Sequence, residues 1–126
     1  MSLSLRDRLS NGRSTFDAYR MEESHRPLFL HGDASIVLDE IPAESVDFCT
    51  TSPPYWGQRS YSGGGIGREE SHAEYLAHLL AIFGKVHRVL KRTGSFWLNG
   101  GDTYFKKNLL GLPWRLVADS PSISEF

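Results

Sequence analysis

The segment from Thr51 to Trp56, Thr-Ser-Pro-Pro-Tyr-Trp, holds the residues best suited to chemistry. Two consecutive prolines restrict the backbone and lack N–H donors, so nearby carbonyl groups can face a ligand rather than a strand ladder. A base amino group is a poor nucleophile because its lone pair is delocalised into the ring. A hydroxyl and a backbone carbonyl could hold both amino hydrogens and draw the nitrogen toward tetrahedral geometry, and Tyr55 could stack on a base swung out of its duplex. The alternative is a proline-rich turn with a half-buried aromatic ring, and these residues alone leave both interpretations open.

Two further polar clusters follow apolar segments of the chain. Gly32-Asp33 closes the run 28–31, and Asn99-Gly100-Gly101-Asp102 closes the run 95–99. In an open parallel sheet, ligands bind beyond the carboxyl ends of the strands. We therefore expect these clusters and the segment after Thr51 to line one rim of a sheet, although each cluster alone is a weak signal.

Strands and helices alternate along the predicted domain. Apolar runs predict strands at residues 28–31, 46–51 and 95–99. A short helix should span Ile36 to Ile41 and end near Pro42, and another should begin near Leu109. This order predicts an α/β fold in which crossover units form a mainly parallel sheet.

The longest predicted helix follows a capping-box pattern of Ser71 and Glu74. Apolar residues spaced along one face continue it to Leu90, and Thr93-Gly94 should end it. Its last turns are basic, which complements the helix dipole. The pattern favours a solvated helix end over a phosphate contact for this cluster of Lys85, His87, Arg88, Lys91 and Arg92.

Length and composition limit the remaining options. The 126 residues suit one domain, with a polar arm at 1–26 (a weak helix or mobile arm), an ordered part at 27–118 and a polar tail at 119–126. A net charge of −1 argues against coating nucleic acid by bulk electrostatics. The sequence has no run suited to a membrane span or a signal peptide, which predicts a cytoplasmic protein without a membrane partner. The single cysteine, Cys49, excludes a disulfide framework or cysteine zinc site within the chain and suits a small core residue, so no metal site is predicted.

The quartet Ser52-Pro53-Pro54-Tyr55 resembles the catalytic motif of the S-adenosylmethionine-dependent DNA amino-methyltransferases. In that family Asp, Asn or Ser precedes Pro-Pro-Tyr. The serine form followed by Trp56 is most similar to the cytosine-N4 group, whose scaffold the adenine-N6 enzymes share. The flanking segments are also similar, so that the resemblance covers residues 28 to about 117.

The resemblance implies part of a Rossmann-like methyltransferase fold with a mainly parallel sheet. It also implies a catalytic site at the quartet of Ser52, Pro53, Pro54 and Tyr55, where Ser52 and the carbonyl of Pro53 bind the target amino group. Tyr55 would stack on the flipped base, and Trp56 would wall the base pocket or simply join the core. Double-stranded DNA is the implied partner.

S-adenosylmethionine is the implied cofactor, with Asp33 near its adenosyl part and Ser52 at the same site. The family's main cofactor signature, Phe-x-Gly-x-Gly, is absent from this sequence. The glycines at 63–67 do not replace it, because they follow the catalytic segment rather than a strand that enters a helix. We therefore expect a truncated enzyme, a frameshift or one piece of a split enzyme that a second polypeptide completes.

The predicted function is site-specific methylation of cytosine N4 in DNA, within a restriction-modification system. One alternative is the same chemistry on adenine N6, RNA or a protein glutamine, and Ser52 counts against the glutamine enzymes, which use an Asn form. The other is a non-catalytic fragment that needs a second half.

Overall fold

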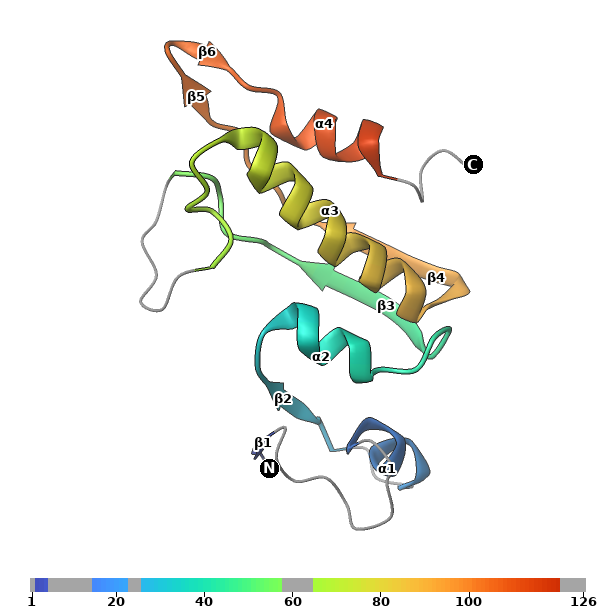
Figure 1. The fold of residues 1–126 in the computed structure, drawn as a ribbon. Coiled ribbons are helices and arrows are strands. Elements are labelled where there is room, and N and C mark those ends of the chain that lie inside the picture. Colours follow the sequence, from blue (N-terminus) through green and yellow to red (C-terminus); the bar gives the residue numbers. More distant parts are fainter. Residues whose placement is uncertain (1, 5–14, 23–25, 58–64, 121–126) are drawn as a thin grey trace.

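The computed structural model describes residues 2–4, 15–22, 26–57 and 65–120. Figure 1 shows their course. The elements in chain order are β1 (Ser2–Ser4), α1 (Thr15–Met21), β2 (Phe29–His31), α2 (Ala34–Glu40), β3 (Val46–Thr51), α3 (His72–Val89), β4 (Leu90–Leu98), β5 (Tyr104–Phe105), β6 (Asn108–Leu109) and α4 (Leu112–Asp119).

The parallel pair of β3 and β4, joined by α3, is the central crossover unit. Thr51 pairs with Leu98 at the carboxyl end of both strands. The structure confirms the predicted bounds of β3, but β4 begins at Leu90 rather than near residue 95. The helix ends early because its last carbonyls, at Arg88 and Val89, accept hydrogen bonds from the amides of residues 44 and 45. Tertiary hydrogen bonds thus override the helical pattern.

Three two-stranded sheets form within the described residues, where the sequence pattern predicts one sheet. β2 pairs in parallel with β1 and not with β3. Consecutive strands of a parallel fold need not be neighbours. The predicted single rim is therefore wrong for the cluster after β2. β1 and α1 lie in the segment expected to be a weak helix or arm, and residues 5–14, 23–25 and 121–126 of the predicted arm and tail lie outside the described residues.

An antiparallel hairpin of β5 and β6 was not predicted. Its two turn residues, Lys106 and Lys107, have φ values of 50° and 66°. Such left-handed turns usually contain Asn or Gly, so Lys-Lys gives no sequence signal for a hairpin.

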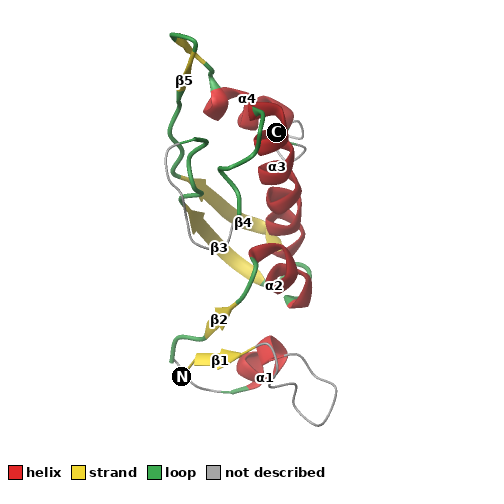
Figure 2. Cartoon of the chain, turned by 60° about the vertical axis from the view of Figure 1, so that its left-hand side comes forward, coloured by secondary structure: helices red, strands yellow, loops and turns green. Residues whose placement is uncertain are grey.

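The core lies between α3, α4 and one face of the β3–β4 pair (Figure 2). Leu79 of α3 and Leu112 of α4 are almost fully buried, and the ring of Phe83 meets that of Phe96 edge-on at 5.1 Å. On these strands Phe48 and Trp97 are 54% and 66% exposed. The α3 face is packed, whereas these two rings remain open to solvent.

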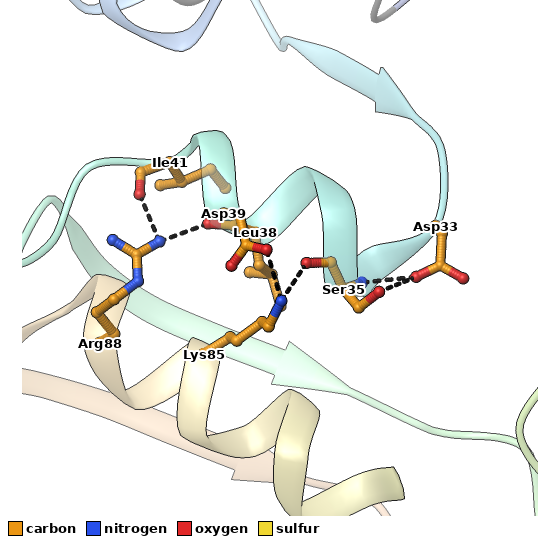
Figure 3. A network of polar contacts seen from close by, with 7 residues as sticks. All are labelled: Asp33, Ser35, Leu38, Asp39, Ile41, Lys85 and Arg88. Atoms are coloured by element: carbon orange, nitrogen blue, oxygen red, sulfur yellow. Dashed lines mark hydrogen bonds and ion pairs between the residues drawn. The ribbon is translucent and has the colours of Figure 1, made fainter.

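Basic residues near the end of α3 hold α2 in place (Figure 3). The Lys85 ammonium donates to the Asp39 carboxylate at 2.6 Å, and the Arg88 guanidinium donates to the carbonyls of Leu38 and Ile41 at 2.6 and 2.8 Å. These carbonyls lie at the end of α2, where the Leu38 carbonyl also accepts from the Ile41 amide at 3.2 Å. Both side chains remain partly or fully exposed, as the predicted solvated helix end requires, and in addition they join the two helices.

No helix in the described part of the chain is long and apolar enough to cross a membrane.

Candidate active site

The loop after β3 and the segment after β4 lie side by side, as predicted. The amide of Asn99 donates to the carbonyl of Thr51 at 2.9 Å, which joins the carboxyl ends of the two strands. The ring of Tyr55 lies directly over Gly101. A Cβ atom on that glycine would lie 2.7 Å from Cε2 of the ring, so only glycine fits there without a shift of Tyr55.

Tyr75 reaches this loop from the first turn of α3. Tyr75 is 3% exposed, and its hydroxyl donates a hydrogen bond to the carbonyl of Pro54 at 2.9 Å. Burial raises the pKa of Tyr75 to about 12, and the charges of Glu69 and Tyr55 add to the effect. The phenol is therefore a neutral donor throughout the physiological range.

Glu69 fixes the other end of the loop. Its carbonyl accepts from the Trp56 indole N–H at 3.0 Å, and its carboxylate accepts from the Gly67 amide at 2.8 Å. His78 Nδ1 lies 2.9 Å from the same carboxylate, whose side chain is 5% exposed. Burial alone would raise the pKa of Glu69, but the bonds from His78 and Gly67 lower it, which keeps the carboxylate charged.

Gly67 packs against the loop in a conformation that favours glycine, with φ of 102°. Its carbonyl accepts from the Gly57 amide at 3.0 Å, and a Cβ atom would lie 3.1 Å from the carbonyl oxygen of Tyr55. The loop is therefore held from α3, from the segment before α3 and from the end of β4.

Trp56 packs against the hydrophobic core cluster. Its ring lies 6.0 Å from the rings of His72 and Phe105. These contacts account for its half-buried state, and its predicted role in a base pocket stays a prediction.

Ser52 and Pro53 occupy the middle of this braced loop. Ser52 is exposed. Within the described residues, no hydrogen bond engages its hydroxyl or the Pro53 carbonyl. These two acceptors lie between the carbonyls of Thr51 and Pro54, which are both hydrogen-bonded.

Asp33 is the one predicted site residue set apart from this loop. It caps the N-terminus of α2, where its Oδ1 accepts from the amide and the hydroxyl of Ser35 at 2.8 and 2.6 Å (Figure 3). These bonds, the hydroxyl's first, lower the pKa of Asp33. Its strand belongs to the β1–β2 pair. The structure thus brings the Ser52 and Asn99 clusters together and leaves the Gly32-Asp33 cluster separate.

Asp102 anchors α4. Its carboxylate accepts from the backbone amides of Thr103, Gly111 and Leu112 at 2.8 to 3.0 Å. Although burial would raise the pKa of Asp102, the bonds from these amides lower it. The sequence showed a polar cluster here, but not this anchoring role.

Two other features concern the predicted chemistry. Cys49 is half-buried on β3, and burial raises the pKa of its thiol, which disfavours the nucleophilic thiolate. Among residues 2–4, 15–22, 26–57 and 65–120, no three His, Cys, Asp or Glu side chains are grouped to hold a metal ion.

Comparison with known proteins identifies the class. A family model described as DNA methylase, named for N6 and N4 methyl transfer, matches residues 46–122. That match includes the Ser52 loop, its braces and the end of β4. The chain belongs to this DNA methylase family, and the predicted family and α/β fold are confirmed.

Individual relatives are longer than this chain. It is 35% identical over 116 residues to the Type II methyltransferase M.SmaI of Serratia marcescens, covering 68% of this chain and 40% of the relative. It is 43% identical over 94 residues to the Type II methyltransferase M.MwoI of Methanothermobacter wolfeii, which covers 71% of this chain and 14% of the relative. The solved PvuII DNA methyltransferase (cytosine-N4-specific) matches with a TM-score of 0.56 and 29% identity over 71% of this chain and 31% of its own. The chain thus spans less than half the length of these relatives.

Proposed function

We propose that residues 27–118 form the catalytic part of a DNA methyltransferase that transfers a methyl group from S-adenosylmethionine to N4 of cytosine. The observation that carries the proposal is the Ser52-Pro53 pair: within the described residues its hydroxyl and carbonyl accept no hydrogen bond, whereas the carbonyls of Thr51 and Pro54 on either side are both bonded. The serine form of the quartet and the likeness to the cytosine-N4-specific PvuII DNA methyltransferase support N4 over N6. The Type II names of the relatives support a role in restriction-modification.

The loop suggests a mechanism of direct transfer without a covalent enzyme intermediate. The Ser52 hydroxyl and the Pro53 carbonyl each accept a hydrogen of the target amino group, and the nitrogen lone pair becomes less delocalised into the ring. Tyr55, held by Gly101, stacks on the flipped base and keeps that nitrogen in line for attack. S-adenosylmethionine, when bound, supplies the electrophilic methyl group.

The described residues fit this cofactor only in part. Asp33 presents an exposed carboxylate, and the Ser35 bonds engage Oδ1, so Oδ2 can accept from a hydroxyl or amino group of the adenosyl part. Ser52 would face the methyl-bearing end. The remaining contacts would come from the portion of a methyltransferase that this chain does not match in its relatives.

We further propose that the portion of a methyltransferase that this chain does not match packs on the β3–β4 pair, whether it is supplied by the same or a second polypeptide. Parallel sheets are normally covered on both faces, and two strands make a marginal sheet. The exposed rings of Phe48 and Trp97 give the portion an apolar surface to cover. Without it we expect no measurable cofactor binding at micromolar protein, and self-association of the chain.

Mass spectrometry of nucleosides from cells that make this chain, alone and with its genetic neighbours, tests the proposal. We expect N4-methylcytosine in the second case, and its loss on Ser52→Ala. N6-methyladenine instead would support the adenine enzyme. No methylated base in either case would support a non-catalytic fragment.

A further inference from the structure

We propose that Tyr75 is a positioning residue for methyl transfer. Its hydroxyl holds the Pro54 carbonyl toward α3, which leaves the Ser52 hydroxyl and the Pro53 carbonyl available to the amino group. This inference rests on the proposed function and adds to it the group that sets the geometry of the loop.

The chemistry of the loop makes such an anchor necessary. Pro53 and Pro54 have no N–H, so this part of the chain can be fixed only through its carbonyls and side chains. The carbonyl of Thr51 is held by the Asn99 amide, and that of Pro54 by the Tyr75 hydroxyl. These two bonds bracket Ser52 and Pro53.

The anchor itself is rigid. Tyr75 lies in the core cluster with Leu76 and Leu79, at the start of an 18-residue helix. Next to it, the Glu69 carboxylate joins His78 of the same helix to the Gly67 amide. A phenol that stays protonated cannot become an anion that would repel the Pro54 carbonyl.

Core packing alone does not account for the hydroxyl. A phenylalanine ring would fill the same space without a polar atom, and burying a hydroxyl is unfavourable unless it is hydrogen-bonded. The Tyr75 hydroxyl makes its hydrogen bond to a loop carbonyl 21 residues earlier in the chain. The ring therefore serves the core, and the hydroxyl serves the loop.

Three variants separate these two roles. Tyr75→Phe keeps the ring and removes the donor, and 4-aminophenylalanine at position 75 keeps the ring and restores a donor. Tyr104→Phe is the matched control, since Tyr104 is 71% exposed in β5. Each is assayed for kcat and for KM toward DNA in the system that gives methylated cytosine.

A second measurement, made on the same protein, needs no catalytic activity. In an HNCO spectrum the Tyr55 amide correlates with the Pro54 carbonyl carbon, so its chemical shift reports the Tyr75 bond directly. We expect an upfield shift of this carbon in Tyr75→Phe, and near-native values in the 4-aminophenylalanine and Tyr104→Phe proteins.

For catalysis we expect kcat to fall by about 100-fold in Tyr75→Phe with little change in KM, because a small misplacement of reacting groups has effects of that order. The 4-aminophenylalanine protein should recover most of the loss, which a purely structural role of the ring would not require.

Wild-type kcat in Tyr75→Phe, or an unmoved Pro54 carbon, overturns the inference. If Tyr75→Phe does not fold, failure of the 4-aminophenylalanine protein to match the wild-type carbon shift and kcat overturns it instead. If the wild type transfers no methyl group, the proposed function fails, and the carbon shift alone decides whether Tyr75 holds the loop.

Discussion

The Ser52–Trp56 loop and the Gly32-Asp33 turn each follow a parallel strand, yet they are held in different ways. Among the described residues, the Asp33 side chain bonds to Ser35 alone, two positions along the chain. The loop is held by groups distant in sequence: Trp56 bonds 13 residues away, and Pro54 bonds 21 residues away. One is a local cap, and the other is a junction of several elements.

This difference indicates where the protein has built a precise geometry. A cap needs one acceptor and starts one helix, and it places no constraint on the rest of the fold. A loop braced from α3, β4 and the segment before α3 keeps its shape only when those elements are all in place. Such support from surrounding residues is what a catalytic constellation requires.

Of the changes considered, replacement of Ser52 by alanine should have the largest effect on methyl transfer. In the system that methylates DNA, loss of an acceptor that acts on the reacting group should lower kcat by roughly 100-fold or more. Ser52 is exposed and unbonded to described residues, so the thermal unfolding midpoint should not change. Turnover within a few-fold of wild type, measured by tritiated methyl transfer, would reject its role.

Tyr55→Ala should weaken binding of the flipped base by about 1–3 kcal/mol, which is the usual contribution of base–aromatic stacking. A fluorescent base analogue at the target position reports extrusion of the base. Gly101→Ala is a matched test, because the new methyl group would force the Tyr55 ring to move while leaving the ring in the protein. Unchanged flipping in both variants would remove Tyr55 from the site.

The sequence predicted the loop but not its braces. Ser52 to Tyr55 could be recognised because two adjacent prolines directly after a strand are a strong local signal that the backbone turns and leaves carbonyls unpaired. Tyr75, by contrast, falls in the apolar pattern of α3, where an aromatic residue predicts only core packing. Gly101 was predicted only as part of the polar cluster at the rim. Its contact with Tyr55 and the bonds of Glu69 have no sequence signal, since their partners lie far along the chain.

For the fold, too, the sequence predicted what local signals set and missed what long-range pairing sets. The predicted bounds of β3 and the Ser71 cap rest on local signals and are confirmed, with Ser71 accepting from the Glu74 amide at 3.2 Å. The start of β4 and the partner of β2 depend on long-range pairing, which residue patterns do not encode. The β5–β6 hairpin was missed because its Lys106-Lys107 turn lacks the usual residues.

Asp102 caps the start of α4 although it lies outside that helix, so its loss should lower the stability of the fold. Asp102→Ala should destabilise the fold by about 1–2 kcal/mol, as expected for a lost capping acceptor. Because the pKa of Asp102 is lowered, its contribution is fully present above the ordinary value of 3.8 and is lost as the pH falls below it. Urea unfolding at pH 7 and pH 3 should therefore show a smaller difference between wild type and variant at the lower pH. An equal difference at both would mean that the charge does not contribute.

The smallest effect on stability is expected at Asp33. Its role as the cap of α2 and its proposed role in cofactor binding can be separated by two substitutions. Asp33→Asn keeps an oxygen for the Ser35 bonds and removes the charge, whereas Asp33→Ala removes both. Because asparagine caps helices as well as aspartate does, only the alanine protein should show a lower unfolding midpoint, and the loss should be smaller than for Asp102→Ala. Neither change should move the Pro54 carbonyl carbon shift, since the loop has no bond to this turn within the described residues. In the completed enzyme, weaker S-adenosylmethionine binding by Asp33→Asn at unchanged stability would assign the carboxylate to the cofactor. Unchanged binding would leave Asp33 as the cap of α2 alone.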